Sequence, residues 1–202
     1  MPEQKIAETT KPSHVSRCTS HSPQSTPPFS FQLSAFSLFL LSLLLSGCVL
    51  PPKDAITIDV PFIPQEQRNR CGAIALEMSL LFFGTEYDRE HLNEEAFVPA
   101  LDGAPPELLA SVAISYGHPA RIRICSIADL RTALARQQVP IVYLRSTDET
   151  RVGHFAIVTG VASRGSKLRL HLPRKSNRWI SKTELLHRSV DGQFPAVLLT
   201  RD

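Results

Sequence analysis

Cys71 and His154 are the residues whose types and positions could together perform covalent catalysis. Cys71 opens the apolar run "CGAIALEMSLLFFG" and follows a polar loop. A cysteine at the start of a helix meets free N–H groups and the positive end of the helix dipole, so we expect a lowered thiol pKa and a reactive thiolate. Gly72, directly after it, would let a substrate carbonyl come close to the backbone.

His154 and Gln65 supply the other groups that a thiol nucleophile needs. His154 begins the apolar segment "HFAIVTG" and could take the thiol proton and later give it to a leaving amine. Gln65 lies six residues before Cys71, where its side-chain amide could form an oxyanion hole with the Cys71 backbone N–H. Taken singly, each residue is better explained as a core cysteine, a surface histidine or a loop amide.

The hydrophobic pattern predicts the elements that must position these residues. Residues 71–83 are apolar almost all round, with Glu77 as the only charge, which predicts a central buried helix ending at Gly84. The order of the remaining elements predicts an α+β fold, with a helical subdomain against a mostly antiparallel sheet. Helices are expected within 87–97, 104–117, 126–138 and 181–189, and strands or extended segments within 56–64, 120–125, 140–146, 153–163, 167–173 and 194–200.

The motifs "VPFIPQEQRNRCGAIAL" and "GHFAIVTG" resemble those of papain-like cysteine peptidases related to the enzymes that process bacteriocin leaders at a double glycine. The resemblance spans about residues 58–200. It implies a papain-like fold whose central helix carries the catalytic Cys71, with His154 at the start of a sheet strand and Gln65 in the oxyanion hole.

One position departs from the family pattern. The family's aspartate, which orients the histidine, precedes a proline one strand later, where this chain has Leu172 before Pro173. Leucine cannot accept the imidazole N–H, and His171 would face the other side of a regular strand. Ser176 or Asn177 could substitute through a bent loop. The chain could therefore be a Cys/His enzyme or one that has lost activity.

The N-terminal segment predicts export and lipid anchoring. The apolar stretch from Leu33 to Leu45 is shorter than the ~20 residues of a membrane span and suits a signal peptide. Residues 45–48, "LSGC", resemble a bacterial lipobox, in which Cys48 is lipidated after cleavage. An uncleaved anchor is the alternative. Val49 after Cys48 resembles the outer-membrane sorting pattern, so we expect a cell-envelope protein that faces the periplasm.

Composition excludes several other classes of protein. A net charge of +3 with 20% charged residues gives no strongly basic surface, so nucleic acid is not an expected partner.

Cys125 could pair with Cys71 but is better explained as an inert core thiol. Arg68 and Arg70 are better explained as part of a solvated loop, although they could also assist the thiolate. The scattered histidines have no ligand spacing, so we expect no metal and no cofactor. These are His91, His118, His171 and His187.

The sequence thus predicts a signal peptide at 1–47, a lipidated stalk at 48–56 and a papain-like peptidase domain at 57–202. The leading hypothesis is a lipid-anchored cysteine peptidase that hydrolyses peptide or protein substrates in the cell envelope. The alternatives are a catalytically inactive binding or scaffolding lipoprotein with the same fold, and an acyl transfer other than peptide hydrolysis. Nothing in the sequence indicates the oligomeric state.

Overall fold

The computed structural model of the chain describes residues 54–146 and 153–201, which lie in the compact unit Val49–Asp202. The predicted signal peptide and Cys48 lie outside the described residues. No helix within the described ranges is both long and apolar enough to cross a membrane.

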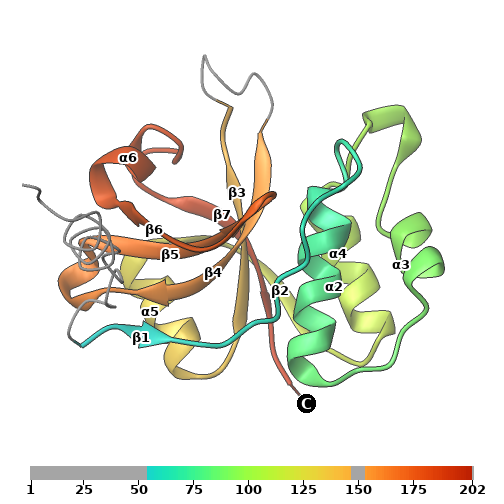
Figure 1. The fold of residues 1–202 in the computed structure, drawn as a ribbon, viewed down its shortest axis with the longest axis horizontal. Coiled ribbons are helices and arrows are strands. Elements are labelled where there is room, and N and C mark those ends of the chain that lie inside the picture. The colour runs from blue at the N-terminus through green and yellow to red at the C-terminus, as the bar shows by residue number, and fades with distance from the viewer. Residues whose placement is uncertain (1–53, 147–152, 202) are drawn as a thin grey trace, which may run out of the picture. The chain divides into compact units, whose positions relative to one another are not determined.

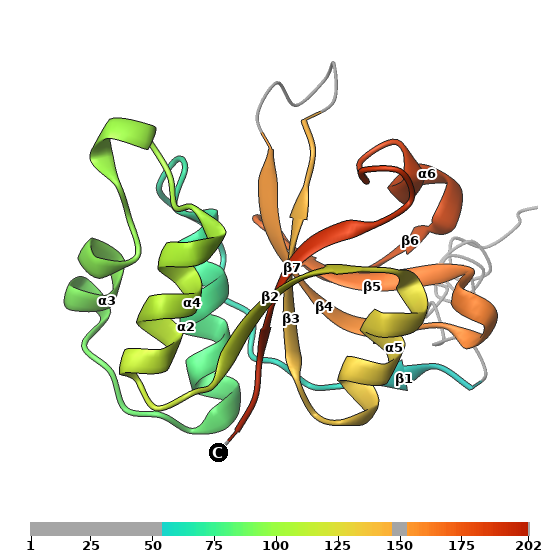
Figure 2. The ribbon, with the colours of Figure 1, turned by 180° about the vertical axis from the view of Figure 1, so that it is seen from behind.

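A single antiparallel sheet organises the described residues, with strand order β2-β7-β3-β4-β5-β6 and β1 paired to β4 (Figure 1). The helices α2, α3 and α4 gather at one side of the sheet, away from α5 and α6 (Figures 1 and 2). The predicted α+β fold, with a helical subdomain against an antiparallel sheet, is confirmed. The strands are β1 (Ile56–Thr57), β2 (Ala120–Cys125), β3 (Val139–Leu144), β4 (His154–Val161), β5 (Lys167–Leu172), β6 (Lys175–Ser181) and β7 (Phe194–Leu199). The helices are α2 (Cys71–Phe83), α3 (Arg89–Glu95), α4 (Pro106–Ser115), α5 (Ile127–Ala135) and α6 (Lys182–Leu186), with short 3-10 turns η1 (Pro99–Leu101) and η2 (Ser163–Gly165).

The helix boundaries follow from local chemistry. Gly84 ends α2 in the left-handed conformation, with a φ of 75° that glycine adopts without a Cβ clash. Pro106 occupies the first turn of α4, where its missing N–H costs nothing. Ser126 and Asp129 form a reciprocal capping box at the start of α5.

The segment expected at 56–64 as a short strand or an extended entry begins with the two residues of β1, and the Ile58 N–H still donates to the Thr159 carbonyl at 2.9 Å. One strand prediction needs correction. The predicted bent loop at Ser176 and Asn177 is instead part of β6, an edge strand whose outer residues are mostly exposed. Strand β6 was missed because its residues are mostly polar, and an edge strand does not need a regular alternation of apolar residues.

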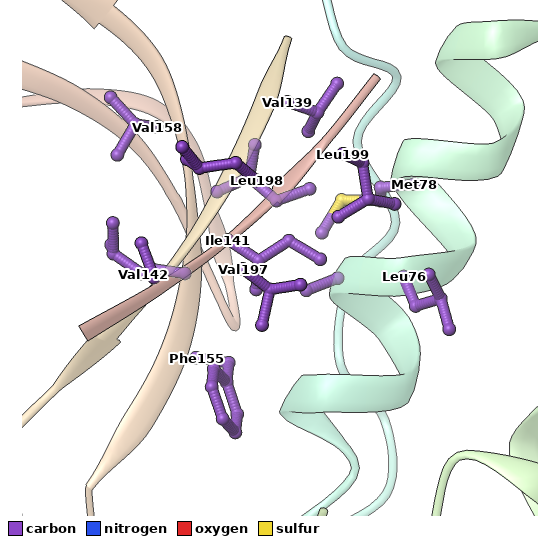
Figure 3. Close-up of a cluster of buried hydrophobic side chains, with 14 of the residues drawn as sticks. Leu76, Met78, Val139, Ile141, Val142, Phe155, Val158, Val197, Leu198 and Leu199 are labelled. Atoms are coloured by element: carbon purple, nitrogen blue, oxygen red, sulfur yellow. The ribbon is translucent and has the colours of Figure 1, made fainter. Parts of the chain in front are cut away.

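The core lies between α2 and the sheet, and it holds the start of α2 in place. Met78 of α2 is buried against the sheet near Ile141 of β3 and Val197 and Leu199 of β7, while Leu76 is buried on the face of α2 that points away from the sheet (Figure 3). At ~25 cal/mol per Å² of apolar surface, each fully buried leucine contributes roughly 2 kcal/mol. The packing therefore fixes where the N-terminus of α2 meets the sheet.

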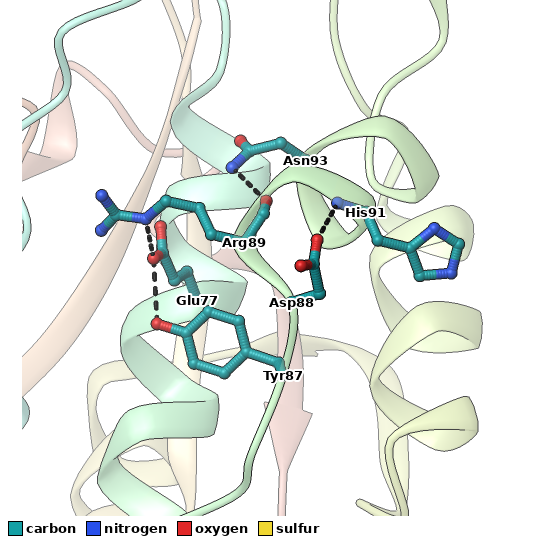
Figure 4. A network of polar contacts seen from close by, with 6 residues as sticks. All are labelled: Glu77, Tyr87, Asp88, Arg89, His91 and Asn93. Carbon is teal, nitrogen blue, oxygen red and sulfur yellow. Dashed lines mark hydrogen bonds and ion pairs between the residues drawn. The ribbon is translucent and has the colours of Figure 1, made fainter.

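Glu77 is the one charged residue of α2, and it is buried with partners. Its Oε1 accepts a hydrogen bond from the Tyr87 hydroxyl at 2.9 Å and from Arg89 Nε at 2.6 Å (Figure 4). Burial together with the neighbouring carboxylate raises the pKa of Tyr87 to about 12. The contacts tie α2 to the start of α3, because a buried carboxylate is tolerated only when it is hydrogen-bonded and paired.

His171 is a buried structural histidine in β5. Its Nε2 donates to the Val60 carbonyl at 2.8 Å, and its Nδ1 accepts from the Asn177 N–H at 3.1 Å. Both nitrogens are therefore used by the neutral ring. Burial is the main reason that the pKa of His171 is lowered, and the nearby charge of Arg169 acts in the same direction.

The neutral state of His171 predicts a loss of stability in mild acid. Because its folded pKa is below its unfolded pKa, the unfolded chain takes up the proton first, and the free energy of unfolding should fall as pH drops below ~6.5. Urea denaturation of the full chain between pH 7.5 and 5 measures this. His171→Gln should be less stable at pH 7.5 yet lose less on acidification, whereas His91→Gln, at an exposed position, should behave like wild type. An unchanged pH dependence in His171→Gln would contradict the assignment.

Candidate active site

Cys71 is the first residue of α2, as predicted, and it is half-buried. The residue before it, Arg70, provides no side-chain cap, so the first N–H groups of the helix are free of a capping side chain. Cys71 and the buried Cys125 are both free thiols, so the two do not form a disulfide.

The electrostatic state of the Cys71 thiol differs from the expectation. Backbone N–H groups of Phe155, Gly72 and Cys71 itself approach the sulfur and favour the thiolate, but burial outweighs them and raises the pKa of the thiol. The predicted lowering of the thiol pKa is therefore wrong. The helix terminus does supply anion-stabilising donors, but the same packing that brings them together also removes water.

Gly72 serves helix packing rather than substrate access. A Cβ on Gly72 would lie 3.1 Å from the Ala104 Cβ and 3.2 Å from a methyl carbon of Leu109. Its missing side chain thus lets α2 pack closely on α4 and the preceding loop, which corrects the expectation that it makes room for a substrate carbonyl.

Arg70 is a structural residue that holds the loop before Cys71. Its guanidinium lies 3.7 Å from the centre of the Phe97 ring, and its Nη1 donates to the Asn93 carbonyl at 2.5 Å. These contacts anchor the residue preceding the nucleophile to the region of α3. Arg68, by contrast, is exposed, as expected of a solvated loop.

His154 is the first residue of β4 and pairs with Leu144 of β3. The next residue, Phe155, is the one whose backbone N–H approaches the Cys71 sulfur. The structure thus brings the start of α2 against the start of β4. No hydrogen bond joins the Cys71 thiol to the imidazole among the described contacts, as is common before a substrate tightens the site.

The imidazole of His154 is held in its neutral form. Burial lowers the pKa of His154, and the positive charge of Arg188 lowers it further. Its Nδ1 is buried and has no hydrogen-bond partner in the described part of the chain. Both shifts are toward the neutral form, so they favour a neutral thiol and a neutral imidazole over an ion pair in the resting site.

Aromatic rings support the start of β4. The Tyr143 and Phe155 rings meet edge to face with centroids 5.4 Å apart. A Cβ on Gly153 would collide with the Tyr143 hydroxyl, so glycine is required there for the ring to pack beside His154. The packed rings of Tyr143 and Phe155 hold in place the backbone that carries the His154 imidazole.

Gln65 is anchored to the sheet, but its contact with Cys71 is not formed. Its backbone N–H donates to the Pro173 carbonyl at 2.7 Å, which ties the loop before α2 to the β5–β6 turn. Its Nε2 donates to the Gln67 carbonyl at 2.8 Å, and its Oε1 is buried without a partner. An amide nitrogen carries two hydrogens, so one remains for an oxyanion.

The residues considered as the third member of the site do not orient His154. Leu172 packs partly buried against the hydrophobic core. The Asn177 side chain accepts from the Thr159 hydroxyl at 3.0 Å, and its backbone N–H binds His171. No hydrogen bond involving the Ser176 side chain is among those of the described residues.

Arg188 is a site residue that sequence reasoning missed. It follows α6 and is half-buried, and its Nε and Nη2 are buried without partners in the described ranges. An arginine after a short polar helix carries no motif, so only the tertiary structure could place it near His154.

A hollow of about 910 Å³ adjoins the loop before Cys71 but contains neither Cys71 nor His154. It lies between this loop and the helices α2 and α3, and Arg70 and Ile74 line it. Within the described ranges no three His, Cys, Asp or Glu residues are grouped so that they could hold a metal ion.

The raised thiol pKa predicts the pH dependence of Cys71 alkylation. In ligand-free protein, the iodoacetamide rate at Cys71 should still be rising above pH ~8.5, the ordinary cysteine pKa, because burial disfavours the thiolate. Mass spectrometry of the Cys71 peptide after timed labelling across pH 5–10 measures this, with Cys125→Ala as the control chain. A high plateau of reactivity below pH 7 would reveal a standing thiolate and refute the neutral resting pair.

Comparison with known proteins assigns the fold and the family. The model of the Peptidase C39 family matches residues 59–188. The fold resembles that of a C39-like peptidase from Bacillus anthracis (TM-score 0.59, 17% identity, 74% of this chain and 98% of that one). It also resembles the peptidase domain of Streptococcus ComA, a bifunctional ABC transporter involved in a quorum-sensing pathway (0.55, 17%, 71% and 100%). A third similar structure is a double glycine motif protease from an AMS/PCAT transporter in complex with the leader peptide (0.52, 20%, 74% and 94%). No curated protein matches the chain in sequence. The chain belongs to the Peptidase C39 family and is a cysteine peptidase.

Proposed function

We propose that the chain hydrolyses peptide bonds with Cys71 as nucleophile and His154 as general acid and base. The observation that carries this proposal is the packing of α2, which begins at Cys71, against β4, which begins at His154, with the Phe155 backbone close enough to the Cys71 thiol to favour its thiolate. The buried Nδ1 of His154 has no hydrogen-bond partner among the described residues and is therefore free to accept the thiol proton.

The neutral resting pair sets the order of events. Proton transfer from the Cys71 sulfur to His154 accompanies attack on the substrate carbonyl, rather than preceding it. The carbon–sulfur bond forms, the carbonyl π electrons move to oxygen, and the oxyanion meets the Cys71 N–H and the free hydrogen of Gln65 Nε2. The imidazolium then gives its proton to the leaving amine, and water, activated by His154, hydrolyses the thioester.

Leu172 supports a second candidate function. Without a carboxylate at this position, nothing among the described residues fixes the imidazole in its catalytic orientation, and rate is lost. A binding or scaffolding role with little turnover is therefore the alternative. Acyl transfer to an acceptor other than water would use the same three residues.

We further propose that the chain is a lipoprotein of the bacterial cell envelope, anchored through Cys48 and facing the periplasm from the outer membrane. The support is the apolar segment 33–45 followed by the lipobox-like "LSGC". Among the similar structures, one is a complex with a leader peptide. By analogy the substrate here is a peptide or protein segment, although an envelope location does not favour a leader.

Substitution of the proposed nucleophile and base tests the enzymatic proposal. Cys71→Ala should abolish cleavage of a mixed peptide library by the purified full chain, and His154→Ala should lower kcat at least ~100-fold, since general acid–base catalysis contributes that much or more. Cys125→Ala, at a buried thiol outside the site, should remain active. Equal cleavage by Cys71→Ala and Cys125→Ala would refute the mechanism, and the absence of cleavage by wild type would favour the binding role.

Lipid labelling tests the anchor. Cells expressing the chain and fed radiolabelled palmitate should incorporate label, and Cys48→Ser should abolish incorporation because the thiol that carries the lipid is gone. Cys18→Ser is the matched control. It should still incorporate the label, because Cys18 is not the proposed attachment point. Continued labelling of Cys48→Ser would refute the lipobox.

A further inference from the structure

Arg188 lies at the same end of the sheet as His154. The Arg188 carbonyl accepts a hydrogen bond from Arg145 N–H at 2.9 Å, and the residue before Arg145, Leu144, is the strand partner of His154. The Arg188 N–H donates to the Leu185 carbonyl at 2.9 Å, which fixes its backbone at the end of α6. The guanidinium is near enough to the imidazole for its charge to act on His154.

The unused donors of Arg188 form one edge of the guanidinium. Nε and Nη2 are both buried and both without a partner within the described part of the chain. These two N–H groups point side by side, which is the geometry that binds a carboxylate through two parallel hydrogen bonds. Leaving them unpaired away from water costs free energy, so this edge lacks an acceptor that the described residues do not supply.

Among the described acidic side chains, Glu184 is the one whose charge acts on Arg188, and no hydrogen bond joins it to this edge. Glu184 acts on Arg188 electrostatically, but its Oε1 lies 3.6 Å from Arg178 Nη2 and both of these side chains are largely exposed. Leu172, at the place where the family has its aspartate, is apolar. The site thus has a cation and a histidine but no described carboxylate to go with them.

We propose that the Nε/Nη2 edge of Arg188 binds a carboxylate of the peptide substrate beside the scissile bond, on the leaving-group side. The inference rests on the proposed peptidase function and adds a specificity to it. His154 must reach the leaving amine to protonate it, so a carboxylate held next to His154 belongs to the segment that leaves. Hydrolysis itself is unchanged, since the carboxylate binds without any covalent step.

Carboxylate binding would also favour catalysis in the correct complex. In the free protein the unpaired charge of Arg188 disfavours the imidazolium. A bound carboxylate neutralises that charge, so the imidazolium that forms during attack becomes easier to generate only when such a substrate is present. A ligand group would thereby supply part of what the family aspartate provides.

Two sources have the same chemistry, a free C-terminus and an Asp or Glu side chain. Four fluorescein-labelled tetrapeptide pools of mixed sequence separate them: free C-terminal carboxylate, C-terminal amide, and amidated pools with Asp or with Asn fixed at the third position. Binding is followed by fluorescence anisotropy on full-length Cys71→Ala protein, so that no turnover is needed.

The carboxylate-bearing pool of at least one pair should bind about 10- to 100-fold tighter than its neutral counterpart, the range expected for a paired charged hydrogen bond. Adding Arg188→Gln should remove this preference, and so should Arg188→Lys, which keeps the charge but lacks the paired edge. Arg178→Gln, at the neighbouring exposed arginine, should retain it. The pair that shows the preference identifies the source.

Equal binding within both pairs, no binding of any pool, or a preference that survives Arg188→Gln and Arg188→Lys would overturn the proposal. Circular dichroism tests whether each variant is folded. If Arg188→Gln does not fold, the comparison uses Arg188→Lys alone. Cleavage by the Cys71-containing protein is scored separately. Preferential binding without cleavage would support the carboxylate site and refute the proposed peptidase function. Cleavage without any binding preference would support the peptidase function and refute the carboxylate site.

Discussion

The meeting of the Cys71 sulfur with the Phe155 N–H is the constraint on which the site depends. It requires the first turn of α2 to abut the first residues of β4, two segments far apart in the sequence. Core packing of α2 on β3 and β7 sets the position of the helix, while Gln65 and Arg70 tie the loop before it to the β5–β6 turn and to α3. Catalytic geometry in this protein is therefore a consequence of how a nearly uniformly apolar helix is buried.

The same burial decides the electrostatics. Water is removed from the thiol and from the imidazole, which favours the neutral form of each despite the donors at the helix terminus. Arg188 reinforces this state, because its charge opposes the imidazolium and no described carboxylate offsets it. Both effects act against a standing ion pair and favour creation of the charge together with the tetrahedral intermediate or with the help of a bound ligand.

Sequence reasoning located most elements because their signals are local. The apolar run from Cys71 and the stop at Gly84 each act within a few residues, and both are found as predicted. The edge strand β6 was missed, because its polar residues bury little and its pairing with β5 is decided by a partner strand. Gly72 was given the wrong role for a similar reason: its neighbours Ala104 and Leu109 are distant in the chain.

The sequence alone determined which chemical groups are present and the order in which helices and strands bring them: a cysteine at a helix start, a histidine at a strand start, and a leucine where an acceptor was expected. It could do so because residue type, capping and periodicity act over short range. Only the tertiary structure decided the protonation tendency of Cys71 and His154, the engagement of Asn177 with Thr159, and the place of Arg188. Desolvation and the electric fields of charged groups depend on which residues are close in space. Folding brings together residues that are far apart in the sequence.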